Sequence, residues 1–316
     1  MKGYFVFISF LIILLTSCRS TAEKPGDLKD TDRRQIPSEN TALTPEPVLT
    51  LEQYRTDDTE FTSLSPAGQN KLIRSVINQM SMDEKIGQIF MLAVRHSAWG
   101  QPALEADDYI KEFMDRYKPG GIIFFSLNFE SPGQTRQMIQ DLQDHSAYPL
   151  FITTDEEGGK VSRLGKAENM NVISLPPAAE LGTINSPELT EYAASVLAAD
   201  MRDLGFNMNM APVADLRAPL GQTDIMRTRS FSRDPAVNAD MTAAFVKGLQ
   251  DKGISSVLKH FPGHGNVDED SHHGASASDS SRTEFREREF ASFRSGIEAG
   301  AHFVLTAHIA APALSG

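Results

Sequence analysis

The sequence predicts an α/β fold of the (β/α)8 TIM-barrel type, with about six of the eight strands present. Apolar runs of strand length alternate with amphipathic stretches of helix length, a pattern typical of parallel strands covered by helices. Polar or charged residues follow several of these runs, namely Asp155, Asp215, Lys259 and His308. Reactive side chains gathered at the carboxyl ends of different strands favour a barrel over a doubly wound sheet.

The expected elements follow one another in a regular order. Strands are expected over residues 89–94, 121–125, 149–154, 208–211, 255–258 and 302–306, where apolar residues run without interruption. Apolar residues have helical spacing over 66–80, and Ser81 followed by Glu84 is close to a capping box that would begin a short helix. Further amphipathic helices are expected over residues 190–204, 236–252 and 283–299.

The N-terminus has the pattern of an export signal. Lys2 precedes a nearly continuous apolar run over residues 4–15, which suits a secretory signal and is short for a transmembrane helix. The run ends in the sequence LTSC, which resembles the lipobox of bacterial lipoproteins and predicts lipidation at Cys18. The sequence therefore predicts an exported lipoprotein, anchored to a membrane on the periplasmic or cell-surface side. The alternative is a cytosolic domain whose start is buried and whose Cys18 is incidental.

The sequence divides into three parts. Residues 1–18 are the expected lipoprotein signal peptide. Residues 19–65 are rich in Thr, Pro and charged residues and lack a sustained apolar period, so they cannot bury enough apolar surface to offset the entropy of ordering. We expect them to form a flexible linker. Residues 66–316 are expected to form the folded domain.

Composition limits the classes of function. The chain has 316 residues, is 40% hydrophobic and 23% charged, and carries a formal net charge of -12. Such a composition fits a globular domain with a sizeable core. A surface that binds phosphates needs clustered Lys and Arg, so no nucleic-acid partner is expected. Cys18 is the only cysteine, which excludes an intramolecular disulfide.

Three segments carry candidate binding residues. Asp155 begins the sequence DEEGGKVSR, in which two glycines permit a sharp turn after three acids. In the functional interpretation Asp155 accepts hydrogen bonds from substrate hydroxyls and Arg163 returns toward it; the alternative is a solvated acidic loop. Asn209 and Asp215, near the next strand, are equally well explained as holding loops. In the basic loop 227–231, one arginine could pair with Asp155 or contact a ligand.

The densest cluster of reactive side chains is KHFPGHG over residues 259–265, followed by Asp270 and His272. His260 and His264 have the i, i+4 spacing of helical zinc sites, but a proline and a glycine between them oppose a helix. Asp270, His272 and His273 could complete a metal site, in an order that matches no zinc signature. No metal or other cofactor is therefore expected, and a metal-dependent hydrolase is the minor hypothesis.

Acid/base chemistry explains the same cluster better. Asp270 and His272 are two residues apart, so on an extended loop their side chains point the same way, and the Asp can fix the imidazole tautomer. His272 could then donate and recover a proton. Lys259 and His260 are suited to binding polar groups of a substrate. His264 and His273 are interpreted as residues that stabilise the loop.

Together these segments resemble glycoside hydrolase family 3, in its bacterial β-N-acetylglucosaminidase branch, over residues 66–316. The resemblance implies a retaining reaction through a covalent glycosyl-enzyme, with His272 as acid/base and Asp270 as its partner. It also implies substrate-binding roles for a set of five residues: Asp155, Arg163, Arg229, Lys259 and His260. Glu156 and Lys160 stand where the family more often has Gln and Arg.

The resemblance implies a substrate with β-linked N-acetylglucosamine, from cell-wall or chitin fragments. The nucleophile of the family is an Asp on the strand after the one ending near Thr306, so we expect it beyond Gly316 and expect no turnover by the 316 residues alone. A non-catalytic sugar-binding lipoprotein and a β-glucosidase of the same family remain alternatives. Because a neutral imidazole does not repel anions, phosphorolysis is a further, minor possibility.

Overall fold

The structure is a computed structural model that describes residues 64–217, 226–264, 267 and 276–315. The predicted signal peptide, with Cys18, and nearly all of the predicted linker lie outside the described residues, as do Asp270, His272 and His273. The chain divides into two compact units, one of residues 17–85 and one that includes residues 86–316.

The described part of the smaller unit is helical, as predicted. Helix α3 (Pro66–Gln79) begins at the N-cap Ser65, whose hydroxyl accepts the N–H of Gly68 at 3.2 Å. The capping box expected at Ser81 is confirmed, because Ser81 Oγ accepts the N–H of Glu84 at 3.2 Å and Glu84 Oε2 accepts the N–H of Ser81 at 2.8 Å. It begins helix α4 (Met82–Gln88).

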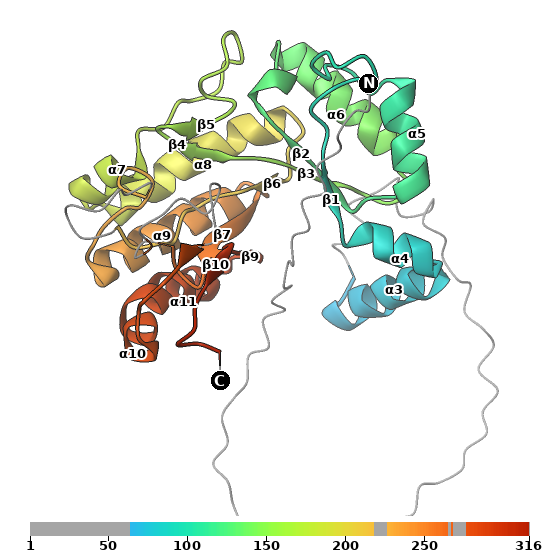
Figure 1. Cartoon of the computed structure of the whole chain (residues 1–316). Coiled ribbons are helices and arrows are strands. Elements are labelled where there is room, and N and C mark those ends of the chain that lie inside the picture. Colours follow the sequence, from blue (N-terminus) through green and yellow to red (C-terminus); the bar gives the residue numbers. More distant parts are fainter. Residues whose placement is uncertain (1–63, 218–225, 265–266, 268–275, 316) are drawn as a thin grey trace, which may run out of the picture. The chain divides into compact units, whose positions relative to one another are not determined.

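The larger unit is built on parallel strands that follow one another around a curved sheet (Figure 1). The six expected strands are all found: β1 (Met91–Ala93), β2 (Gly121–Phe124), β3 (Phe151–Thr154), β6 (Met208–Asn209), β7 (Ser255–Phe261) and β9 (Phe303–Thr306). They pair as β1-β2-β3 and β6-β7-β9. Two backbone hydrogen bonds join β3 to β6, from Asn207 N to Ile152 O at 3.2 Å and from Met210 N to Thr154 O at 3.0 Å.

The order of the strands confirms the barrel-type prediction. Among the described residues, each of these strands neighbours the one that precedes it in the sheet, and the order never reverses. A doubly wound sheet would reverse its strand order at a switch point. Consecutive parallel strands joined by helices instead curve in one direction, as in a (β/α)8 barrel.

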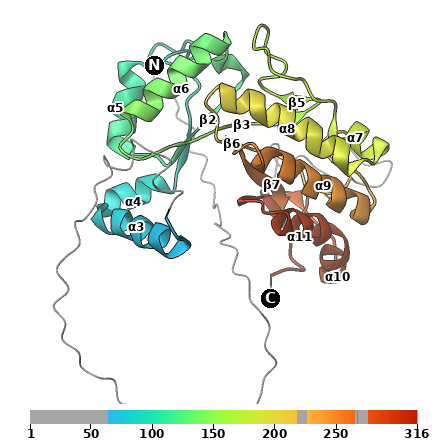
Figure 2. The same cartoon turned by 180° about the vertical axis from the view of Figure 1, so that it is seen from behind.

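Helices occupy the connections between these strands. They are α5 (Asp108–Tyr117), α6 (Pro132–His145), α7 (Ala178–Ile184), α8 (Pro187–Asp203), α9 (Pro235–Gln250), α10 (Arg282–Glu284), the π-helical turn η2 (Phe285–Glu289) and α11 (Phe290–Glu298). The three amphipathic helices predicted from the sequence correspond to α8, α9 and the α10–η2–α11 segment. Helices α8 and α9 lie side by side in both views (Figure 2).

Short elements decorate these connections. The 3-10 turn η1 (Ser126–Asn128) follows β2, and the hairpin of β4 (Glu156–Gly158) and β5 (Val161–Ser162) follows β3. The pair β8 (Ser276–Ala277) and β10 (Ile309–Ala310) is parallel. In the β4–β5 hairpin, Gly158 and Gly159 have φ of 91° and 57°, so the turn predicted at these glycines is confirmed.

Burial on both faces explains why the strands are apolar throughout. In β2, Ile122 and Phe124 pack in the cluster that includes Met138 and Leu142 of α6, whereas Ile123 packs on the other face with Met91. Successive side chains of a strand point to opposite faces, so both faces of this sheet are apolar. Within the described residues, no helix has the length and apolarity needed to cross a membrane.

One predicted boundary is wrong in a way that matters for the site. Strand β7 was expected to end at residue 258, but it continues through Phe261. Lys259 pairs with Leu305, Phe261 pairs with Thr306, and Val213 forms a bridge to Lys259 on the other side. These backbone pairings on both sides extend the strand, with a register shift between Lys259 and Phe261. Lys259 and His260 therefore lie within the strand and not after it.

Candidate active site

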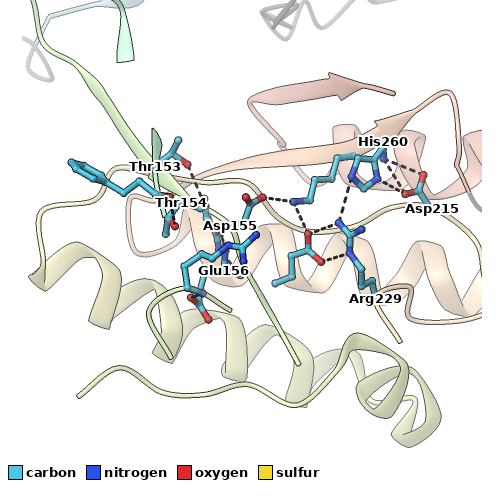
Figure 3. A network of polar contacts seen from close by, with 12 residues as sticks. Thr153, Thr154, Asp155, Glu156, Asp215, Arg229 and His260 are labelled. Carbon is cyan, nitrogen blue, oxygen red and sulfur yellow. Dashed lines mark hydrogen bonds and ion pairs between the residues drawn. The ribbon is translucent and has the colours of Figure 1, made fainter. Parts of the chain in front are cut away.

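The strand ends bring together four of the residues that the sequence singled out (Figure 3). Asp155 directly follows β3, and Lys259 and His260 lie near the end of β7. Arg229 comes from the loop before α9. Lys259 pairs with Asp155, and Glu157 bridges Lys259 to Arg229. Arg229 lies beside His260, which a further acid, Asp215, binds.

Lys259 is a buried cation between two carboxylates. Its Nζ lies 2.7 Å from Asp155 Oδ1 and 2.6 Å from Glu157 Oε1. The Lys259 side chain is 2% exposed, whereas that of Asp155 is 20% exposed. A buried charge is tolerated when it is paired and hydrogen-bonded, as it is here. Lys259 thus holds one oxygen of Asp155 in place and leaves that carboxylate open toward a ligand.

Glu157 joins this cation to a second one. Arg229 binds it in bidentate fashion, with Nε 2.8 Å from Oε2 and Nη2 2.7 Å from Oε1. Burial alone would raise the pKa of Glu157, but the charges of Lys259 and Arg229 outweigh burial and lower that pKa to about 2. Glu157 is therefore an anion at every physiological pH, and it orients both cations.

Asp215 anchors His260 and the turn that follows it. Its Oδ2 lies 2.7 Å from Nδ1 of His260, and its Oδ1 accepts the backbone N–H of His264 at 2.8 Å. Burial acts to raise the pKa of Asp215, yet His260 and these hydrogen bonds lower it overall. Burial also lowers the pKa of His260, and the positive charges of Lys259 and Arg229 lower it further. Together these effects outweigh Asp215, which acts to raise that pKa. A neutral His260 that donates its Nδ1–H to an ionised Asp215 satisfies both groups.

Glu156 has a structural role. Its side chain is fully buried and accepts the hydroxyl of Ser162 together with the backbone N–H groups of Arg163 at 2.8 Å and Leu164 at 2.7 Å. Burial raises its pKa in spite of these hydrogen bonds. The N–H and O–H donors around the Glu156 carboxyl group occupy its oxygens, so its role is to close the β4–β5 hairpin and not to bind a ligand.

The other predicted residues have mixed outcomes. The arginine of the basic loop, Arg229, binds Glu157 and not Asp155. The Nε of Arg163 is buried with no hydrogen-bond partner among the described residues. Asn209 holds a loop, as one interpretation predicted, because its amide exchanges two hydrogen bonds with the backbone of Glu156, at 2.9 and 3.1 Å. Asp270 and His272, the predicted acid/base pair, lie outside the described residues, so their roles stay predictions.

The structure adds Glu157, which the sequence analysis did not single out. Glu157 lies two residues after Asp155, and residues two apart in an extended segment face the same side. This i, i+2 spacing is the sequence signal that could have identified Glu157 as a site residue. Within the described residues, no group of three or more His, Cys, Asp and Glu side chains is arranged to hold a metal ion. The rings of His260 and His264 have centroids 5.9 Å apart.

A barrel-type α/β domain with a cluster of acids, bases and cations at the carboxyl ends of its strands belongs to the class of (β/α) barrels that carry their sites at this face. Residues 81–316 match the family described as the glycosyl hydrolase family 3 N terminal domain. The chain belongs to this family, and the resemblance found in the sequence is confirmed.

Relatives of known name support the same branch. The chain is 33% identical over 201 residues to a beta-hexosaminidase of Nitrosomonas eutropha, covering 62% of this chain and 56% of that protein. It is 32% identical over 211 residues to a beta-hexosaminidase of Stenotrophomonas maltophilia, covering 65% of this chain and 61% of that protein. The chain thus spans about six tenths of the length of these relatives.

Solved structures agree. A glycoside hydrolase family 3 beta-N-acetylglucosaminidase from a Paenibacillus strain superposes with a TM-score of 0.68 at 35% identity, over 74% of this chain and 43% of that one. NagZ from Neisseria gonorrhoeae, in complex with N-trifluoroacetyl-D-glucosamine, gives a TM-score of 0.64 at 28% identity, over 71% of this chain and 64% of that one. The fold prediction is confirmed by these neighbours.

Proposed function

We propose that the protein is a retaining glycoside hydrolase that removes β-linked N-acetylglucosamine from cell-wall or chitin fragments. The observation that carries this proposal is the linked cluster of Asp155, Lys259, His260 and Arg229 at the strand ends of a family 3 domain. Relatives named beta-hexosaminidase support it. Because the chain spans only part of their length, the activity is proposed for the whole protein.

The cluster is suited to holding a sugar ring by its hydroxyl groups. Asp155, His260 and Arg229 have side chains that are 20%, 19% and 16% exposed, so each can reach a ligand. Lys259 and Glu157 are 2% and 3% exposed. From these buried positions they hold Asp155 and Arg229 in place. A carboxylate that accepts, an imidazole and a guanidinium that donates together complement the donors and acceptors of sugar hydroxyls. Arg163 is proposed as a further binding residue.

The chemistry of the proposal follows the retaining scheme. A carboxylate attacks the anomeric carbon to form a glycosyl-enzyme, while a general acid protonates the leaving oxygen. The general acid, now deprotonated, then acts as a base and activates the water that releases the sugar. We propose His272 for the acid/base role, with Asp270 fixing its tautomer. The nucleophile is proposed to be an Asp on the strand that follows β9 in the whole protein.

An assay with chromogenic glycosides tests the proposal. The protein at the length of its curated relatives is expected to hydrolyse the β-N-acetylglucosaminide faster than the β-glucoside and to release sugar, not sugar 1-phosphate, when phosphate is added. His272→Ala is expected to lower turnover by about 10²–10⁴-fold, the usual contribution of a general acid/base. His273→Ala is the matched control and should retain activity. Binding of the sugar without turnover would instead favour the non-catalytic sugar-binding protein.

We also infer that the protein is a membrane-anchored lipoprotein that is exported and acylated at Cys18. The lipobox-like sequence before this only cysteine supports the inference. Wild-type protein is expected to incorporate a palmitate analogue and to sediment with membranes, whereas Cys18→Ala should do neither. Equal membrane association of the variant without label would refute the anchor.

A further inference from the structure

A further buried acid, Glu289, packs beside the site. Glu289 is the last residue of the π-helical turn η2 and is 4% exposed. It shares the buried face of the η2–α11 segment with Phe285, Ser292 and Phe293. The i, i+4, i+7, i+8 spacing of these residues turns all four toward the core. A Glu is almost never fully buried unless it is paired, so this one calls for an explanation.

Glu289 packs against the turn between His260 and His264. A Cβ placed on Gly263 would lie 2.6 Å from Oε2 and 2.9 Å from Cβ of Glu289, so the glycine backbone and this side chain are in direct contact. Gly263 has a φ of 130°, a conformation that also favours glycine. Any larger residue at 263 would displace Glu289, and removal of the Glu289 side chain would leave the turn unsupported.

Glu289 also holds the segment that carries Asp215. The backbone N–H of Leu216, the residue after Asp215, faces its carboxyl group and acts to lower the pKa of Glu289. Asp215 in turn accepts the backbone N–H groups of His260 and His264, at 3.1 and 2.8 Å. One side chain therefore supports both partners of this contact, the Asp215 segment and the turn after β7.

The charges around Glu289 favour its neutral form. The carboxylate of Asp215 faces it, and Arg288 lies on its own element and is exposed. The imidazole of His260 belongs to the adjoining strand β7, and that of His264 to the turn that follows it. Oε2 is buried and has no hydrogen-bond partner in the described structure. Burial and the charge of Asp215 raise the pKa of Glu289 to about 7, against the opposing effects of Leu216 and Arg288. Below a pH of about 7, therefore, Asp215 is ionised whereas Glu289 keeps its proton.

We propose that Glu289 is a positioning residue, which as a neutral carboxylic acid clamps the turn at Gly263 to the Asp215 segment and so fixes His260 and Lys259 for sugar binding. This rests on the proposed function for its sugar, but the clamp itself is a property of the fold. Loss of the proton places a second negative charge beside Asp215. The two carboxylates then repel each other and the turn loosens, so sugar affinity falls as pH rises through the titration of Glu289.

Three variants test the clamp. Glu289→Gln keeps the size and remains neutral at every pH, Glu289→Ala removes the support, and Glu287→Gln is the control, an exposed Glu two residues away on the same turn. Infrared spectroscopy of the full chain detects the C=O band of a protonated carboxyl group. The other carboxyl groups, including the buried Glu156, are common to both proteins, so the difference between wild type and Glu289→Gln isolates Glu289. Hydrogen exchange of the peptide over residues 255–264 reports the order of the turn.

The clamp predicts a difference band that titrates with a midpoint of about 7 and persists against Glu287→Gln. In Glu289→Ala the turn should lose its protection against exchange. Wild type should lose that protection as pH rises above the midpoint, whereas Glu289→Gln should keep it. KM for an N-acetylglucosaminide should rise about tenfold in Glu289→Ala, with a smaller change in kcat, because small displacements of binding groups carry costs of this order.

Two results would overturn the clamp. One is the absence of a protonated band from Glu289 in mildly acidic buffer, and the other is wild-type protection of the turn in Glu289→Ala. If the protein hydrolyses no glycoside, the proposed function fails, while the infrared and exchange measurements still decide whether Glu289 acts as described.

Discussion

Asp215 binds both the ring and the backbone of His260. Its Oδ2 lies 2.7 Å from Nδ1 of the ring, and its Oδ1 accepts the backbone N–H at 3.1 Å. Nδ1 is therefore the protonated nitrogen of a neutral ring, and Nε2 keeps its lone pair, 3.5 Å from Nη2 of Arg229. A residue on the loop after β6 thus sets the tautomer of a residue on β7.

Asp215→Asn is expected to disturb this arrangement. The Asn amide can donate a hydrogen bond to Nδ1, which would move the ring proton to Nε2 and turn a second donor toward Arg229. We expect kcat/KM to fall by about 10-fold or more, mainly through KM, and nitrogen-15 NMR to show the changed tautomer. Asp240→Asn, on the exposed side of α9, should change neither. An unchanged tautomer in Asp215→Asn would contradict this account.

Lys259→Met should destabilise the fold strongly. The substitution keeps the apolar stem but leaves Asp155 and Glu157 without the cation between them. Breaking a buried ion pair by removing one partner costs about 3–5 kcal/mol. Urea denaturation should show this loss, whereas Lys252→Met, at an exposed turn, should stay within about 0.5 kcal/mol of wild type. A loss of similar size in both variants would argue against the buried pair.

Glu157 should make stability depend on pH in the acid range. Its pKa is lowered from 4.5 to about 2 in the folded protein, so its contribution is complete above 4.5 and is lost as pH falls toward 2. A shift of this size corresponds to a contribution on the order of 3 kcal/mol. Glu157→Gln should therefore be much less stable than wild type at neutral pH, and the gap should narrow in acid.

Denaturation midpoints measured at several pH values check this prediction. Glu168→Gln, which changes an exposed Glu, is the control and should parallel wild type throughout. A constant gap between Glu157→Gln and wild type down to the lowest pH would mean that Glu157 does not titrate as described.

The sequence predicted where the site lies but not how its charges pair. Apolar runs followed by polar residues indicated parallel strands with Asp155 and Lys259 at their ends, and the structure brings these two together at 2.7 Å. The pairing of Arg229 with Glu157 depends on side-chain positions 72 residues apart in sequence, which no local pattern encodes. The positions of residues at strand ends therefore predict which residues lie close together. Which acid pairs with which cation depends on side-chain packing.

The predicted helix over residues 283–299 shows a second limit of the sequence. Periodicity identified the helix, but the structure inserts the π-helical turn η2 before α11. A π turn changes the register of the residues before and after it. Glu289 lies at this junction, at a buried position that matches the helical period. Periodicity marks the position as buried, but the contact of Glu289 with the Gly263 turn depends on packing and not on any local pattern.

Gly248 and Gly133 give a matched pair of glycine-to-alanine substitutions within helices. A Cβ on Gly248 in α9 would lie 2.2 Å from the backbone oxygen of Glu191 in α8, whereas a Cβ on Gly133 in α6 would meet nothing within 4 Å. Gly248→Ala must push α8 and α9 apart, and overpacking of this kind costs about 1–3 kcal/mol. Gly133→Ala should gain about 0.4–1 kcal/mol by restricting the unfolded chain.

The Gly248 substitution should also reach the site. Helix α9 carries Asn238, whose Nδ2 donates to the backbone oxygen of Ala214 at 2.9 Å and so holds the segment that bears Asp215. A displaced α9 weakens that support, and His260 then loses its fixed orientation. Gly248→Ala is expected to raise KM for the sugar as well as lower the denaturation midpoint, while Gly133→Ala raises the midpoint and leaves KM unchanged. A Gly248→Ala protein with wild-type stability would show that the two helices can separate at little cost.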